Sequence, residues 1–238
     1  MLNITISYFG LSCFKIEVKN HEEAVFITDP FDKSAGLNLP RNFTADGVTV
    51  SSDSELHNAI ELVKPTSEKG KFKIISNSGE YEVKNVFVNG ATFFTKDKND
   101  KVIHENNVFQ FAIDDIKITH LGSLARAFTN DEIQAMESCD VLLLPVSSDP
   151  DISAEGGSAS GGKNDISPKS LIEIVSQIDP RIIIPMHYKM PGLKINLNPL
   201  DKFLKEIGKS KFEEMKKFKF TKKDLPAEET KVVVLTRE

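Results

Sequence analysis

The side chains best suited to metal or acid–base chemistry in this sequence are its five histidines: His21, His57, His104, His120 and His187. Three of these imidazoles come at or just after strand-like segments. His120 ends IKITH, His187 ends RIIIPMH, and His57 follows GVTVS by a short turn. Strand ends on one sheet edge commonly form binding sites, and a hydrolytic zinc site needs three or four such ligands. Spacing alone leaves open that each is a hydrogen-bonded structural histidine.

The elements before residue 121 are predicted to be mainly strands. Period-2 alternation of apolar residues predicts three short antiparallel strands at 4–8, 13–18 and 24–28. A further strand at 47–51 is followed by a polar segment at 52–58 and a short helix at 60–63. Two runs, 81–94 and 108–120, have strand composition, with a hairpin turn at 96–100 between them.

The second half of the chain changes period. Helices are predicted at 129–136, opened by Thr129, and after Ser167-Pro168, while 141–145 and 181–187 are apolar runs typical of buried strands. This order predicts two sheets with helices outside, in a single domain over residues 1–238. The segment 147–162 is rich in Ser, Gly and acids, which predicts a flexible surface insertion, with a lid as the alternative.

Composition limits the classes of partner. The 238 residues are 39% hydrophobic and 27% charged, with a net charge of −5, which is typical of a soluble globular protein and opposes nucleic-acid binding. There is no apolar run of the ~20 residues that a membrane helix needs. Two cysteines and no leader-like N-terminus favour the cytoplasm. Residues 201–223 hold nine lysines against four acids, interpreted as a solvated surface rather than an anion site.

Several sequence blocks along the whole chain resemble the metallo-β-lactamase-fold superfamily. They are ITISYFGLSCFKIE, FITDPFDKSAGLNLP, GEYEVKNVFVNG, HLGSLARAFTNDE, DVLLLPV, IIIPMHYK and KKDLPAEETKVVVL. The sequence is similar in particular to Zn-dependent hydrolases related to ascorbate-6-phosphate lactonases. The resemblance implies an α/β fold of four layers, an αββα sandwich, with the metal site at one edge between the sheets.

The resemblance also carries the family's metal-ligand positions onto this chain. The HxHxDH motif aligns with SSDSELH, the next ligand histidine with the end of GATFFT, the bridging Asp with the last residue of HLGS, and the final histidine with PMH. The seven positions are therefore Ser52, Ser54, Leu56, His57, Thr95, Ser123 and His187. Only two of the seven ligands, both imidazoles, remain.

These substitutions predict a degenerate metal site. The first zinc position would have only hydroxyl groups, and the second would keep His57 and His187, which His120 or Glu55 could supplement. We therefore expect no metal cofactor, or zinc only in a partial site. Loss of the metal removes the activated water on which zinc hydrolases depend.

Two functions follow from the resemblance. The first is a non-catalytic pseudoenzyme that binds a small ligand or a protein partner, such as a second copy or an active relative. The alternative is a lactonase-like Zn-dependent hydrolase. A metal-free serine hydrolase would pair one of the aligned serines with His57 or His187, oriented by Asp29 or Asp53; serines that merely fill the vacated volume explain the same residues more simply. No nucleic-acid or membrane partner is expected.

Overall fold

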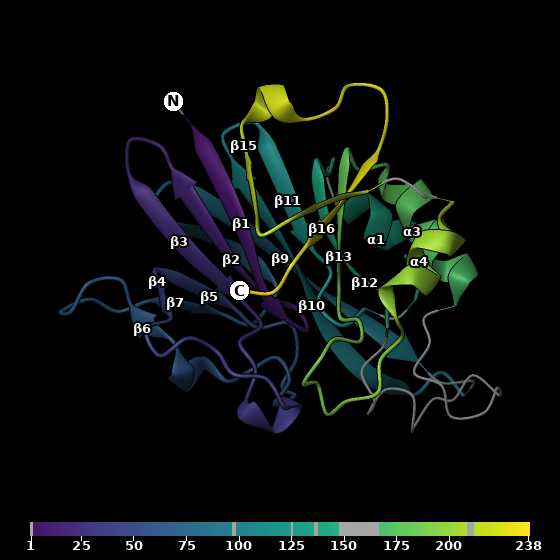
Figure 1. The fold of residues 1–238 in the computed structure, drawn as a ribbon, viewed down its shortest axis with the longest axis horizontal. Helices are drawn as coiled ribbons and strands as arrows, with labels where there is room; N and C mark the ends of the chain where they lie inside the picture. The colour runs from purple at the N-terminus through teal and green to yellow at the C-terminus, as the bar shows by residue number, and fades with distance from the viewer. Residues whose placement is uncertain (1, 97–98, 125, 136–137, 148–166, 209–211) are drawn as a thin grey trace.

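Two β-sheets face each other and form the frame of the molecule (Figure 1). The computed structural model describes residues 2–96, 99–124, 126–135, 138–147, 167–208 and 212–238. In these ranges the first sheet has the order β15 (Lys217–Phe220), β1 (Asn3–Gly10), β2 (Cys13–Lys19), β3 (Glu23–Thr28), β5 (Gly47–Thr49), β7 (Lys73–Ile75). Neighbours are antiparallel from β15 to β3 and parallel from β3 to β7, so the sheet is mixed.

The second sheet is also mixed. Its order is β14 (Glu213–Met215), β16 (Lys231–Leu235), β13 (Ile182–Met186), β12 (Val141–Pro145), β11 (Ile116–His120), β10 (Val102–Ile113), β9 (Val86–Lys96), β8 (Gly79–Val83). The strands from β14 to β11 are parallel, and those from β11 to β8 are antiparallel. Two short strands, β4 (Thr44–Ala45) and β6 (Lys64–Pro65), pair separately.

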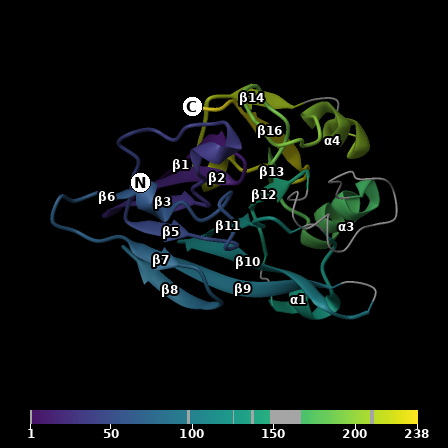
Figure 2. The same cartoon turned by 90° about the horizontal axis from the view of Figure 1, so that it is seen from below.

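The α-helices lie on the outer face of the second sheet. They are α1 (Asn130–Ala135), α3 (Pro168–Ile178) and α4 (Leu200–Glu206), grouped together in Figure 1 and Figure 2. Their starts agree with the sequence: Thr129 Oγ1 accepts from Glu132 N, and Ser167 Oγ accepts from Ser170 N. Among the described helices, none is both long and apolar enough to span a membrane.

Apolar side chains form two clusters, one on each side of the first sheet. The larger fills the space between the sheets, where the Phe26 and Phe111 rings meet edge to face at 5.3 Å between centroids, and continues under α3 and α4. The smaller cluster, which includes Leu11, Ile27 and Phe31, lies under loops and the 3-10 turns η1 (Lys33–Ala35) and η2 (Ile60–Leu62). A third 3-10 turn, η3 (Lys222–Asp224), precedes the last strand.

The short helix predicted at 60–63 is present as the 3-10 turn η2, and it ends before Lys64 because Pro65 disfavours helical backbone at the preceding residue. The prediction of two long strand runs was wrong in one detail. Each of the runs 81–94 and 108–120 contains a tight turn and belongs to two strands. Lys84, Asn85 and Asp114 adopt positive φ at these turns, a conformation that Asn and Asp tolerate better than most residues.

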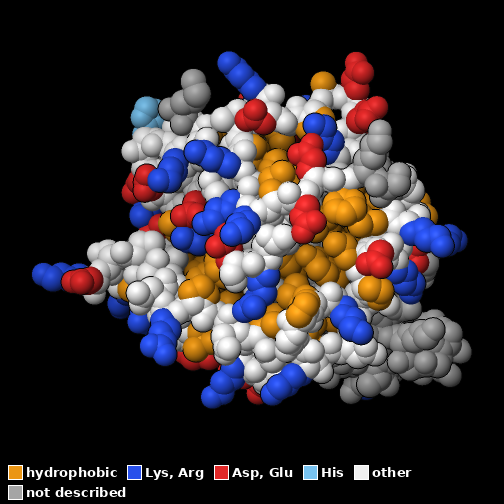
Figure 3. Space-filling view, viewed as in Figure 1, with side chains coloured by type: hydrophobic (Ala, Val, Ile, Leu, Met, Phe, Trp, Pro, Cys, Tyr) orange, Lys and Arg blue, Asp and Glu red, His pale blue; other side chains and the backbone are white. Residues whose placement is uncertain are grey.

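Other predictions are tested only in part. The predicted insertion at 147–162 lies outside the described residues except for Ser147, which is buried and accepts a hydrogen bond from Asn198 N. In the Lys-rich segment, Lys222 pairs with Asp115 and Lys217 with Glu238. Figure 3 shows Lys and Arg side chains mixed with Asp and Glu on the viewed face, which is consistent with a solvated surface.

Candidate functional site

The candidate site lies where strands of both sheets end. Leu11 in the β1–β2 turn, Asp29 after β3 and His187 after β13 all have positive φ, at 51°, 40° and 56°. Such backbone costs of order 1–3 kcal/mol for each non-glycine residue, so surrounding contacts must hold it. Here His187 N donates to the carbonyl of Leu11 at 2.8 Å, and Asp29 N donates to that of Thr49 at 2.9 Å. The chain is thus bent to turn these side chains inward.

Asp29 is the centre of a buried group of polar side chains. Its Oδ1 accepts from Ser51 N at 2.8 Å, and its Oδ2 accepts from Ser51 Oγ at 2.6 Å and from His57 Nδ1 at 2.8 Å. All three side chains are fully buried. A Ser-His-Asp triad needs serine and carboxylate on opposite ring nitrogens, whereas Ser51 and Asp29 both face Nδ1 of His57. This arrangement orients the imidazole and does not activate Ser51.

His120 is held at both ring nitrogens. Gly122 N donates to Nδ1 at 3.3 Å, so the proton lies on Nε2, which donates to the carbonyl of Ser12 at 2.9 Å. Burial lowers the pKa of His120, and the Asp29 carboxylate, 4.0 Å from Nε2, only partly opposes this. His120 is therefore a neutral structural residue and cannot turn toward a metal without breaking both hydrogen bonds.

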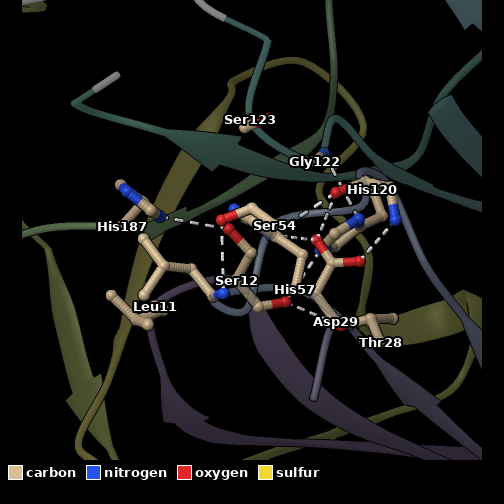
Figure 4. Close-up of polar contacts among 12 residues, drawn as sticks. Leu11, Ser12, Thr28, Asp29, Ser54, His57, His120, Gly122, Ser123 and His187 are labelled. Carbon is tan, nitrogen blue, oxygen red and sulfur yellow. Dashed lines mark hydrogen bonds and ion pairs between the residues drawn. The ribbon is translucent and has the colours of Figure 1, made fainter. Parts of the chain in front are cut away.

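His187 completes this group, which we call the Asp29 cluster: Ser12, Asp29, Ser51, His57, His120 and His187 (Figure 4). Ser12 Oγ lies 3.3 Å from His187 Nδ1, and the rings of His187 and His57 stack with centroids 5.8 Å apart. The structure thus brings together the three histidines that follow strand ends. It also places Asp29, as predicted, and not Asp53, on an imidazole.

The positions that align with the family's metal ligands differ from one another in their surroundings. Leu56 packs against the apolar cluster under the first sheet, and Ser54 Oγ accepts from Leu56 N at 3.3 Å. The hydroxyls of Ser52 and Thr95 are buried and have no hydrogen-bond partner among the described residues. Glu55, a potential replacement ligand, is exposed to solvent.

Ser123 pairs with a histidine that the sequence prediction missed. Its Oγ lies 2.9 Å from His104 Nε2 and 3.2 Å from Asn106 Oδ1, which also accepts from Ser123 N at 2.8 Å. In Figure 4 Ser123 stands away from His57 and His187. Ser123 is only 1% exposed, which counts against its action as a nucleophile. The strand register could have revealed His104, because the turn at 96–100 places it opposite Thr95 on β9.

A polar hollow, which we call the sheet-edge cavity, opens beside the Asp29 cluster. Its volume is about 410 Å³, and it is lined by residues 50–54 after β5, 76–77 after β7, and 103–105 and 107 of β10. Ser52 and Ser54, two of the aligned ligand positions, thus face the same space as His104.

The donor set does not fit a zinc centre. Zinc sites use three or four Cys, His, Asp or Glu ligands, and no group of three such side chains within the described ranges is arranged to hold an ion. Both ring nitrogens of His120 are engaged in hydrogen bonds, and Leu56 supplies no ligand atom. The Nδ1–Asp29 hydrogen bond of His57 is one that metal-binding histidines also make, so it does not by itself argue against a metal.

Comparison with known proteins places this geometry in a family. Residues 5–187 match the Beta-lactamase superfamily domain. A Thermotoga maritima protein, to which Zn-dependent hydrolase activity is ascribed, is 33% identical; the superposition covers 99% of this chain and 100% of that one, with a TM-score of 0.71. This chain belongs to the metallo-β-lactamase superfamily. The predicted αββα sandwich with two mixed sheets is therefore confirmed.

Two further proteins are similar to this chain over most of its length. A UPF0173 metal-dependent hydrolase of Thermoplasma acidophilum is 27% identical over 208 residues, which are 79% of this chain and 84% of that protein. The metallo hydrolase Igni18 of Ignicoccus hospitalis, 16% identical with a TM-score of 0.60 over 92% of this chain and 99% of that one, shares the fold. The loss of metal ligands in this chain stays a prediction.

Proposed function

We propose that this superfamily member binds a small ligand in the sheet-edge cavity and does not use a catalytic metal. The observation that carries the proposal is the chemistry of the aligned ligand positions. Ser52 and Ser54 line the cavity, and Leu56 packs against an apolar cluster. A protein partner, such as a second copy or an active relative, is a further proposal that rests on the sequence alone.

The surroundings of His120 support the same proposal. Both of its ring nitrogens are engaged in hydrogen bonds that stabilise the strand ends, so it is not available to supplement His57 and His187 as a ligand. Neutral hydroxyls are poor zinc ligands, and a zinc hydrolase generates its nucleophile by lowering the pKa of metal-bound water. A site made of Ser52, Ser54, Thr95 and Ser123 has no comparable way to generate hydroxide at neutral pH.

A metal-dependent hydrolase is the second candidate. The observation in its favour is that the Thermotoga and Thermoplasma relatives carry that description. For this chain it would require that at least three ligands be assembled around His57 and His187. His120 could be one of them only after losing a hydrogen bond to Ser12 or Gly122.

Elemental analysis separates the two candidates. Protein purified without chelator and incubated with zinc, iron, manganese or nickel should retain well under one metal ion per chain and show no lactonase or phosphodiesterase activity. Stoichiometric metal that disappears in His57→Ala and His187→Ala, together with hydrolysis, would favour the hydrolase and overturn our proposal.

Restoring the family's ligands tests the alignment behind the proposal. The combined variant Ser52→His, Ser54→His, Leu56→Asp, Thr95→His and Ser123→Asp should gain stoichiometric zinc. The matched control is the same variant with His187→Ala, which should bind less. Circular dichroism checks that both fold. A folded five-residue variant that binds no zinc would contradict the assigned ligand positions.

A further inference from the structure

The charges around the sheet-edge cavity indicate which ligands it accepts. We infer that it binds small hydrogen-bond donors without negative charge, with amines preferred over neutral polyols and phosphorylated compounds binding most weakly. This inference rests on the proposed function, because it names the ligand class of the same site.

The charged side chains on the cavity are acidic. Asp53 and Glu105 line it, and none of the described lining residues is Lys or Arg. Both carboxylates are exposed at the rim and make no ion pair or hydrogen bond with any described residue. They can therefore accept hydrogen bonds from an ammonium or hydroxyl group, while they repel a phosphate.

The cavity wall adds neutral hydrogen-bonding groups. The Ser52 hydroxyl is buried without a partner among the described residues, and the side chains of Ser54, Ser76 and Asn77 face the same space. Some of this capacity is already used: Ser54 Oγ accepts from Leu56 N, and Asn77 Nδ2 donates to Ser76 Oγ at 3.4 Å. The Asn107 amide is used on both sides, because it accepts from Thr92 Oγ1 and donates to the carbonyl of Ser76. A buried hydroxyl that lacks a partner is costly, and rotation of the Ser52 side chain toward the cavity would let a polar ligand satisfy it.

A neighbouring hollow extends the acidic surroundings. It is about 650 Å³, shares Asn77 and Glu105 with the cavity, and is also lined by Asp131 and Glu132. Glu132 is neutralised by paired contacts with Arg126, whereas Asp131 is exposed. None of the described residues that line this second hollow is Lys or Arg. An anionic ligand would thus meet negative charge from both sides of Glu105.

The cavity's size suits a small polar molecule. Its 410 Å³ lies near the lower end of the range for ligand pockets, roughly 300–1,000 Å³. Glucosamine, glucose and glucose 6-phosphate are useful probes because they share one ring and differ in charge. Their binding to the intact chain can be followed by heteronuclear NMR, with all three probes titrated at the same pH and ionic strength.

The expected order of affinity is glucosamine, then glucose, then glucose 6-phosphate, with about tenfold between the first and the last. Shifted amide signals should centre on residues 51–54 and 103–107. The double variant Asp53→Asn and Glu105→Gln should reduce the difference to about twofold, since it removes both rim charges. Glu82→Gln, an exposed acid of β8 outside the cavity lining, should leave the order unchanged.

The outcomes distinguish this inference from the function on which it rests. Preferred binding of glucose 6-phosphate in the cavity would overturn the ligand class and leave metal-free ligand binding intact. Failure of all three probes to shift cavity signals would also overturn the inference for ligands of this size. Stoichiometric metal with hydrolysis would instead overturn the proposed function.

Discussion

The Asp29 cluster and the sheet-edge cavity lie side by side and differ in whether their polar groups find hydrogen-bond partners within the protein. In the cluster, buried polar groups from both sheets bond to one another, and Asp29 alone accepts three hydrogen bonds. In the cavity, Asp53, Glu105 and the Ser52 hydroxyl have no partner among the described residues. Ser51 belongs to both regions, since it bonds Asp29 and lines the cavity.

The difference separates what maintains the fold from what is available to a ligand. Bonds such as Ser12 to His187 and His120 to Ser12 connect the first sheet to the second. They need no metal, so the strand ends can stay in place when ligand residues are replaced. In the cavity wall, Asn107 also joins the sheets by donating to the carbonyls of Ser51 and Ser76. The rim carboxylates of Asp53 and Glu105 take no part in this connection and can serve binding. Substitutions in the Asp29 cluster should therefore lower the stability of the fold, and substitutions of cavity residues such as Asp53 should lower ligand affinity with little effect on stability.

The largest expected effect is that of Asp29→Ala. It removes the acceptor for Ser51 N, Ser51 Oγ and His57 Nδ1 in a fully buried site, and should lower the free energy of unfolding by about 3–5 kcal/mol. Urea titration measures it. The matched change in the cavity, Asp53→Ala, should stay within about 0.5 kcal/mol. Equal losses in the two variants would contradict the contrast.

Acid sensitivity tests the cluster's buried imidazoles. Burial lowers the pKa of His120 in the fold, so below the unfolded value of ~6.5 the unfolded chain binds more protons. Its contribution is therefore present above pH ~6.5 and is lost as the pH falls through the folded pKa, at up to about 1.4 kcal/mol per pH unit.

The variant His120→Gln keeps a donor for the Ser12 carbonyl but does not titrate. Its unfolding free energy, measured by urea titration from neutral pH downward, should fall less steeply than that of the unaltered chain. His21→Gln, at an exposed histidine, is the control and should keep the original slope. An unchanged slope in His120→Gln would mean that this imidazole does not resist protonation.

Strand positions could be predicted from the sequence better than the hydrogen-bond partners of the side chains at the strand ends. Apolar alternation and helix caps predicted β1, β2, β3, β12, β13 and the starts of α1 and α3, because these patterns depend on neighbouring residues. The bond between Ser12 and His187 joins residues 175 positions apart, and no local pattern encodes it. His104 was missed because the second strand of its hairpin was predicted to begin at 108 instead of 102.

The adjacent residues Ser51 and Ser52 test where the boundary between the two regions lies, and the expected effects are the smallest. Ser51 Oγ donates to Asp29 at 2.6 Å, so Ser51→Ala should destabilise the fold by about 1–2 kcal/mol. Ser52→Ala removes a buried hydroxyl without a described partner, and should leave stability within about 0.5 kcal/mol or raise it slightly. Glucosamine binding should nevertheless weaken about threefold in Ser52→Ala, the loss of one ordinary hydrogen bond. Urea titration and NMR titration of both variants measure these effects. If Ser52→Ala cost as much stability as Ser51→Ala and left binding unchanged, Ser52 would belong to the structural cluster and the boundary between the regions would be misplaced.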